Sequence, residues 1–300
     1  MIREIEAKTL LAHSKAPDPW FGVKYNMNLY RGCQHQCIYC DSRSECYQIE
    51  DFNDVLVKAN ALPLLRRELA SKRVKGTIGF GSMSDPYLPA ERQYRLTRQA
   101  LAVIAQKRFP VHMLTKSDLV LRDLDLLEAI NRDTMALVSF TITTADDALA
   151  RKLEPGAPLP SARLRALEVL TAYGIRSGVM LMPVLPFLED SVENITGIVK
   201  TAHRHGAAYI LPSFGLTLRD RQRDYFYQRL DALFPGVSDR YRKTYGERYA
   251  CLPLNHVELE RLLLRPVSGW GWPPLSRAGS RRLRRSSSLC FEPRKVLKCG

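Results

Sequence analysis

The sequence predicts an α/β protein built on an open partial barrel of six β-strand–α-helix units, with a helical C-terminal extension. Three observations support this prediction. Short apolar runs alternate with longer amphipathic segments, and each unit spans about 30 residues, the length of a βα repeat. Six units fall short of the eight that close a barrel. The composition, 45% hydrophobic and 25% charged, is that of a globular chain and excludes a largely disordered or fibrous one.

Strands are predicted by short runs of apolar and β-branched residues bounded by turn signals. The first precedes a cysteine-rich segment, and the others follow at regular intervals. They are expected at residues 26–30, 76–81, 111–115, 135–142, 176–182 and 207–211.

Helices are predicted where apolar residues recur at a spacing of three and four. Gly174 is the expected C-cap of the fourth of them. The helices of the barrel are expected at residues 55–72, 92–107, 123–131, 161–173 and 191–205, and those of the extension at 220–233 and 256–264.

The composition changes along the chain and divides it into four parts. Residues 26–215 carry the βα repeat, and residues 1–25 form an N-terminal arm before it. Residues 216–267 are rich in Arg, Tyr and Leu and predict the helical extension. Residues 268–300 lack apolar periodicity and are rich in Arg and Ser, so we expect a disordered basic tail.

The net charge of +14 suggests an anionic partner such as nucleic acid. Half of this excess lies in residues 277–300, which hold eight Lys and Arg against one Glu, so the charge is weak evidence about the rest of the chain. In residues 219–249, tyrosines alternate with arginines and could stack bases and pair phosphates. An amphipathic helix with a solvated face explains the same pattern, so nucleic-acid binding stays open.

The chain predicts a cytoplasmic protein without a membrane partner. Its first residues lack an apolar run behind a basic start, and no run of about 18 apolar residues occurs. Four of the seven cysteines, Cys33, Cys37, Cys40 and Cys46, fall within fourteen residues. In a reducing compartment this crowding indicates ligation of a metal or cofactor rather than disulfides.

Cys33, Cys37 and Cys40 have C-x3-C-x2-C spacing in a loop after the first expected strand. Three thiolates on one short loop can bind one [4Fe-4S] cluster, whose fourth iron then stays open to another ligand. A structural zinc site with Cys46 or His35 as fourth ligand is an alternative, and would make the chain a nucleic-acid-binding module without catalysis. A loop of unrelated thiols is another.

This spacing, followed by a βα run, resembles the radical S-adenosylmethionine (radical SAM) superfamily. The resemblance implies an enzyme whose open iron binds the amino and carboxylate groups of S-adenosylmethionine. Electron transfer from the cluster then yields a 5'-deoxyadenosyl radical, which abstracts a hydrogen atom from a substrate that the sequence does not identify. A reducing electron donor such as flavodoxin or ferredoxin is implied as well.

Five blocks resemble, more narrowly, the radical SAM group that contains spore photoproduct lyase and its uncharacterised relatives. Each block lies at or just after a predicted strand end, where a βα barrel builds its active site. The blocks are residues 32–40, 81–91, 115–123, 153–156 and 182–186.

The resemblance implies S-adenosylmethionine contacts at six positions but identifies no catalytic residue. They are Tyr39 and Met182 for the adenine, Ser84 and Asp85 for the amino group, Lys116 for the carboxylate and Thr141 for the ribose. Each has an ordinary structural alternative: an Asp-Pro turn, a surface lysine, a β-forming threonine or a core methionine.

One position departs from the lyase pattern. Spore photoproduct lyases use a cysteine in the second-strand block as hydrogen-atom donor, and Ser82 stands at the corresponding position here. A serine O–H bond is too strong for that role, and no cysteine lies between Cys46 and Cys251. The resemblance therefore favours an uncharacterised relative, and a DNA-repair lyase is the weaker alternative.

Overall fold

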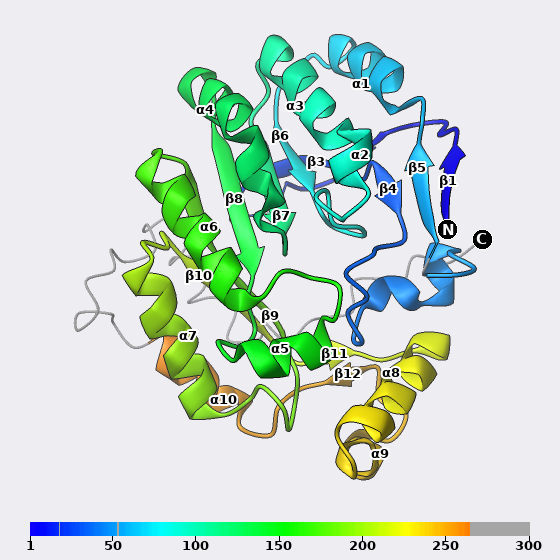
Figure 1. The fold of residues 1–300 in the computed structure, drawn as a ribbon, viewed down its shortest axis with the longest axis vertical. Helices are drawn as coiled ribbons and strands as arrows, with labels where there is room; N and C mark the ends of the chain where they lie inside the picture. Colours follow the sequence, from blue (N-terminus) through cyan, green and yellow to red (C-terminus); the bar gives the residue numbers. More distant parts are fainter. Residues whose placement is uncertain (18, 53, 265–300) are drawn as a thin grey trace.

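A seven-stranded sheet forms the centre of the molecule in the computed structural model, which describes residues 1–17, 19–52 and 54–264 (Figure 1). The strand order is β10-β9-β8-β7-β6-β3-β2, and within the described residues the end strands do not pair with each other, so the barrel is open as predicted. Neighbours from β3 to β10 are parallel, and β2 adds antiparallel to β3. The strands are β2 (Leu11–His13), β3 (Val23–Met27), β6 (Thr77–Phe80), β7 (Val111–Thr115), β8 (Ala136–Thr141), β9 (Arg176–Val184) and β10 (Ile210–Phe214).

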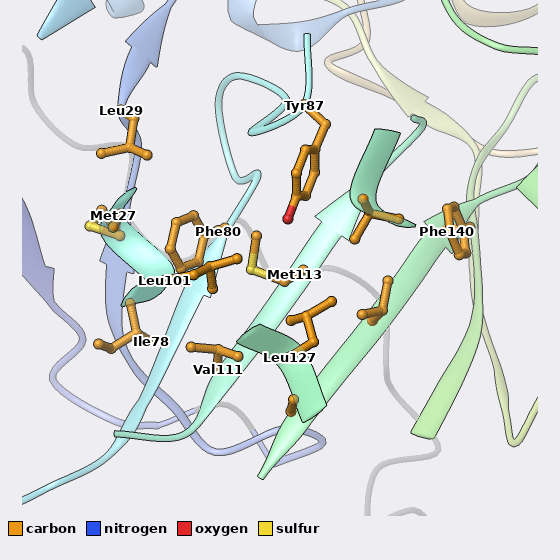
Figure 2. Close-up of a cluster of buried hydrophobic side chains, with 14 of the residues drawn as sticks. Met27, Leu29, Ile78, Phe80, Tyr87, Leu101, Val111, Met113, Leu127 and Phe140 are labelled. Carbon is orange, nitrogen blue, oxygen red and sulfur yellow. The ribbon is translucent and has the colours of Figure 1, made fainter. Parts of the chain in front are cut away.

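Helices cover one face of this sheet. Side chains that alternate along β6 and β7, among them Phe80 and Met113, pack under Leu101 of α3 and Leu127 of α4 (Figure 2). The helices are α1 (Ala61–Ala70), α2 (Glu91–Tyr94), α3 (Leu96–Lys107), α4 (Leu124–Asp133), α5 (Asp147–Leu153), α6 (Pro160–Ala172) and α7 (Val192–Arg204).

A polar chain fills the opposite, inner face near the middle of the sheet. The Ser139 hydroxyl lies 2.7 Å from both His112 Nε2 and the Tyr209 hydroxyl, and Phe21 stacks on the His112 ring at 3.9 Å. All three hydrogen-bonding side chains are buried. Because these side chains fill the middle of the inner face, a functional site is expected at the carboxyl ends of the strands.

The helix predicted over residues 55–72 is wrong in its first part. Val55–Lys58 forms strand β5, which pairs with β1 (Ile2–Ile5) and β4 (Tyr30–Arg31), and only then does α1 begin. Val55 and Val57 are buried and alternate with half-buried residues, which is the period of a strand. The N-terminal arm therefore contributes two strands, β1 and β2, to two different sheets.

The C-terminal extension shares a small core with residues 37–39. Phe226, Leu230, Tyr241 and Tyr245 pack together with Cys251, so most aromatic side chains of the Arg/Tyr-rich segment are buried rather than available to stack bases. The extension consists of β11 (Leu216–Thr217), α8 (Asp220–Leu233), α9 (Val237–Tyr245), β12 (Ala250–Cys251) and α10 (His256–Leu264).

The bounds predicted for α8 and α10 are those observed, whereas α5 and α9 were not predicted. The basic tail predicted at residues 268–300 lies outside the described residues. None of the described helices is long and apolar enough to cross a membrane.

Candidate functional site

Residues 32–40, here called the cysteine loop, follow β4. Cys33 and Cys37 are buried and Cys40 is half-buried, whereas Cys46 is exposed on the 3-10 helix Glu45–Tyr47. Gly32 begins the loop with a φ of +76°, and a Cβ there would lie 2.0 Å from the Asp54 carbonyl oxygen. Only glycine fits this turn.

The three thiols of the loop are electrostatically coupled. Burial raises the pKa of the Cys37 and Cys40 thiols above the ordinary value, and the charge of neighbouring thiolates adds to the effect. Burial also acts on Cys33, but there the positive charge of His35 outweighs it and the pKa of the Cys33 thiol is lowered. The charge states of Cys37 and Cys40 therefore depend on the other thiols of the loop.

The donor set fits a cluster better than a single metal ion. Within the described residues, no three His, Cys, Asp or Glu side chains are grouped as ligands of a single metal ion. In an iron–sulfur cluster each iron takes its own thiolate. His35 Nε2, beside these cysteines, is buried without a nitrogen or oxygen partner in the described part of the chain, and the His35 ring interacts with the Cys33 thiol.

Ser84 and Asp85 hold the cysteine loop from the end of β6. The Ser84 hydroxyl donates to the Gly32 carbonyl at 2.6 Å. Asp85 Oδ2 accepts from the Lys116 N–H at 2.7 Å and lies 3.3 Å from His35 Nδ1.

Asp85 Oδ1 accepts from the Thr115 hydroxyl at 2.7 Å and from the Tyr87 N–H at 2.8 Å. Together with the two partners of Oδ2, these contacts occupy the roughly four acceptor positions of a carboxylate. Burial raises the pKa of Asp85, but His35 outweighs burial and brings it to about 2, so the group is ionised. Binding a ligand ammonium would require Asp85 to give up one of these contacts.

Lys116 follows β7 directly, and its ammonium has fewer close polar contacts than the Asp85 carboxylate. Nζ lies 3.8 Å from Glu154 Oε1, beyond hydrogen-bond distance, and 17% of the side chain is exposed. Burial lowers the pKa of Lys116, but the Cys37 and Glu154 charges outweigh burial and raise it overall. The cation therefore stays protonated and retains donors for an anionic ligand.

The sequence did not predict the buried ion pair between Glu154 and Arg163, which lies beneath the loop. Glu154 accepts hydrogen bonds from the Tyr39 hydroxyl and from Arg163, and all three side chains are almost fully buried. Arg163 also donates to the carbonyls of Thr141 and Pro158, each at 2.8 Å. The pair thus ties the cysteine loop to the end of β8.

The turn Leu153–Gly156 braces the same loop through its backbone. Ile38 N–H donates to the Leu153 carbonyl at 2.9 Å, and Gly156 N–H donates to the His35 carbonyl at 3.0 Å. A Cβ on Gly156 would lie 2.1 Å from the Gln34 carbonyl oxygen. The resemblance includes residues 153–156 but implies no role for them. The glycine after Glu-Pro could have predicted a close backbone contact.

The structure brings most of the predicted site residues to one place. Tyr39, Ser84, Asp85 and Lys116 surround or contact the cysteine loop, and Thr141 joins them through Arg163. Met182, at the end of β9, packs instead with a small apolar group that includes Met180 and Leu211. The ligand contacts assigned to these six residues stay predictions.

The family model described as Radical SAM superfamily matches residues 27–199. An uncharacterised protein of Mycobacterium tuberculosis is 34% identical over 252 residues, covering 81% of this chain and 73% of the relative. An uncharacterised protein of Methanocaldococcus jannaschii is 38% identical over 202 residues, covering 66% and 73%. A radical SAM Nα-GlyT isomerase of Pseudomonas phage M6 is 25% identical over 154 residues, covering 51% of this chain and 32% of that protein.

Among solved structures, spore photoproduct lyase complexed with dinucleoside spore photoproduct has the same fold. The TM-score is 0.67 at 17% identity, and the match covers 90% of this chain and 79% of the lyase. The family model spans more than half of the chain, and the conserved superfamily cofactors are a [4Fe-4S] cluster and S-adenosylmethionine. The chain is therefore an enzyme that belongs to the radical SAM superfamily.

Proposed function

We propose that Cys33, Cys37 and Cys40 ligate the [4Fe-4S] cluster and leave one iron for S-adenosylmethionine. The observation that carries this proposal is the placement of three thiols on one short loop that buried polar contacts brace from both sides. When bound and reduced, the cluster supplies the electron that converts S-adenosylmethionine into methionine and a 5'-deoxyadenosyl radical, which abstracts a hydrogen atom from the substrate.

Different residues around the loop are proposed to bind different parts of S-adenosylmethionine. Lys116 pairs with its carboxylate, because this ammonium retains hydrogen-bond donors. The Ser84 and Asp85 side chains already have partners within the chain, so their first task is to hold the loop in shape. Tyr39, Thr141 and Met182 are proposed to face the nucleoside.

Anaerobic reconstitution tests the ligand set. The wild-type protein should take up four iron and four sulfide, as one such cluster requires, and release 5'-deoxyadenosine with S-adenosylmethionine and dithionite. Ala at Cys33, Cys37 or Cys40 should abolish both results, whereas Cys46→Ala, a matched exposed cysteine, should retain them. Uptake of one zinc without sulfide by the wild type would contradict the proposal.

Ser82 argues against the thymine-dimer reaction. Its hydroxyl accepts a hydrogen bond from the Asn28 side-chain amide at 3.1 Å and is exposed just after β6. We infer that no thiol returns a hydrogen atom from this position. Irradiated DNA should therefore yield no repaired thymine above background, even while 5'-deoxyadenosine forms. Full repair would overturn this inference.

A further inference from the structure

Arg43 is a buried cation next to the proposed cluster ligands. It ends the 3-10 helix Asp41–Arg43, only three residues beyond Cys40, and is 7% exposed. Its guanidinium donates to the Gln36 side-chain oxygen at 2.7 Å and to the Cys37 carbonyl at 3.4 Å. Within residues 1–17, 19–52 and 54–264, no carboxylate lies within 4.0 Å of it.

A buried charge without a counter-ion is costly, so its compensation has to be identified. The geometry points to the cysteine loop, because the guanidinium donates to the Cys37 carbonyl and Arg43 follows Cys40 by three residues. Both cysteines would become ligands of the anionic cluster. The unpaired guanidinium is therefore placed to be balanced by that cluster.

Two aromatic rings hold the guanidinium in this position. It lies 4.2 Å from the ring centroid of Phe52 and 3.8 Å from that of Tyr225. Such contacts favour Arg because its flat cation stacks on rings. Tyr225 belongs to α8, so one half of the sandwich comes from the C-terminal extension.

The start of α8 is fixed to the same segment by polar contacts. Arg221 donates to the Arg43 carbonyl at 2.9 Å, and the Ser44 hydroxyl donates to Asp220 at 2.6 Å. Gln222 donates to the Tyr39 carbonyl at 3.3 Å. Figure 1 shows α8 beside the segment that links β4 and β5, although about 180 residues separate them in sequence.

We propose that Arg43 is a counter-cation of the cluster, beside His35 and Lys116, and that α8, through Tyr225, keeps it there. The inference rests on the proposed cysteine ligation. One-electron reduction makes the cluster more negative, so a fixed positive charge nearby stabilises the reduced form and raises the reduction potential. The C-terminal extension then takes part in setting how readily the cluster accepts an electron.

Redox titration of reconstituted protein with dithionite, followed by the signal of the reduced cluster, tests this proposal. Arg43→Met should shift the reduction equilibrium at least tenfold toward the oxidised form, a potential about 59 mV more negative. Arg43→Lys keeps the charge and should retain most of the wild-type potential. Equal potentials for wild type and Arg43→Met, or equal shifts for Met and Lys, would overturn the proposal.

Variants of Tyr225 test the contribution of α8. Tyr225→Phe keeps an aromatic face and should retain the wild-type potential, whereas Tyr225→Leu should shift it in the direction of Arg43→Met. Iron and sulfide content distinguishes a failure of the proposed cysteine ligation from a failure of the proposed role of Arg43. A wild type without a cluster refutes the proposed ligation, and clusters of unchanged potential in the variants refute only the role of Arg43.

Discussion

Two buried carboxylates near the cysteine loop have opposite surroundings. Burial raises the pKa of Glu154, but Arg163 and then Lys116 outweigh burial and hold it below the ordinary range. Glu189 accepts from the Thr143 hydroxyl at 2.6 Å and from the Leu185 N–H at 3.0 Å, and has no ion-pair partner among the described residues. Burial dominates there and raises the pKa of Glu189 from 4.5 to about 8.

Glu189 should make stability depend on pH. Because its pKa is higher in the folded chain, the folded state binds more protons between pH 4.5 and about 8. The stabilising contribution is complete below pH 4.5 and is lost as pH rises through about 8. Urea unfolding at several pH values should show Glu189→Gln losing this decline, because a neutral amide can bond the same two partners. An unchanged pH profile would contradict the assignment.

The Glu154–Arg163 pair predicts strong coupling between two substitutions. Arg163→Met leaves the buried carboxylate without its hydrogen-bonded cation, with only Lys116 at 3.8 Å, and should cost about 3–5 kcal/mol in the free energy of unfolding. Adding Glu154→Gln removes the orphaned charge and should recover part of that loss. Chemical denaturation of both single variants and the double variant measures the coupling. Simple additivity would mean that the two groups act independently.

At the scale of elements, the turn between α5 and α6 controls the shape of the cysteine loop. Gly156→Ala places a methyl group 2.1 Å from the Gln34 carbonyl oxygen, so turn and loop must move apart. Iron and sulfide uptake should fall severalfold. Gly197→Ala, in the middle of α7 with open space around it, is the matched control and should stabilise the helix by about 0.5–1 kcal/mol. Full uptake by Gly156→Ala would show that the loop tolerates the shift.

Elements with a long, clear period could be predicted from the sequence. β7 and α8 have the expected bounds because apolar spacing identifies them without help from other segments. β5 could not be found in the same way, because it gains its pairing from β1 and β4, distant in sequence. Short strands depend on partners that local patterns do not reveal.

The candidate site, too, could be predicted only where its pattern is local in sequence. The thiol spacing predicted the three proposed ligands because it is local, and strand ends predicted where Ser84, Asp85 and Lys116 would meet. The partners of those side chains could not be predicted, since Tyr39 and Glu154 are 115 residues apart and only the folded chain joins them. Arg43 carried no signal, because its sandwich is completed by α8.

At the scale of the whole molecule, the cysteine loop is held by contacts from three segments that lie far apart in the sequence. Asp54, Glu154 and Gln222 all lie against it. A ligand that binds only the folded loop should therefore stabilise the entire fold. Removing the cluster with a chelator should lower the urea midpoint of a single unfolding transition. Cys33→Ala should have the same low midpoint with or without reconstitution, and two separate transitions would contradict this coupling.

The distance along the chain between the cysteine loop and α8 also matters during synthesis on the ribosome. Gln222 lies 183 residues after Tyr39, so at roughly 5–20 residues per second the thiols emerge many seconds before their cover. Throughout that interval they are exposed to oxidants and stray metals. A cluster delivered in that interval would meet a loop that α8 does not yet cover.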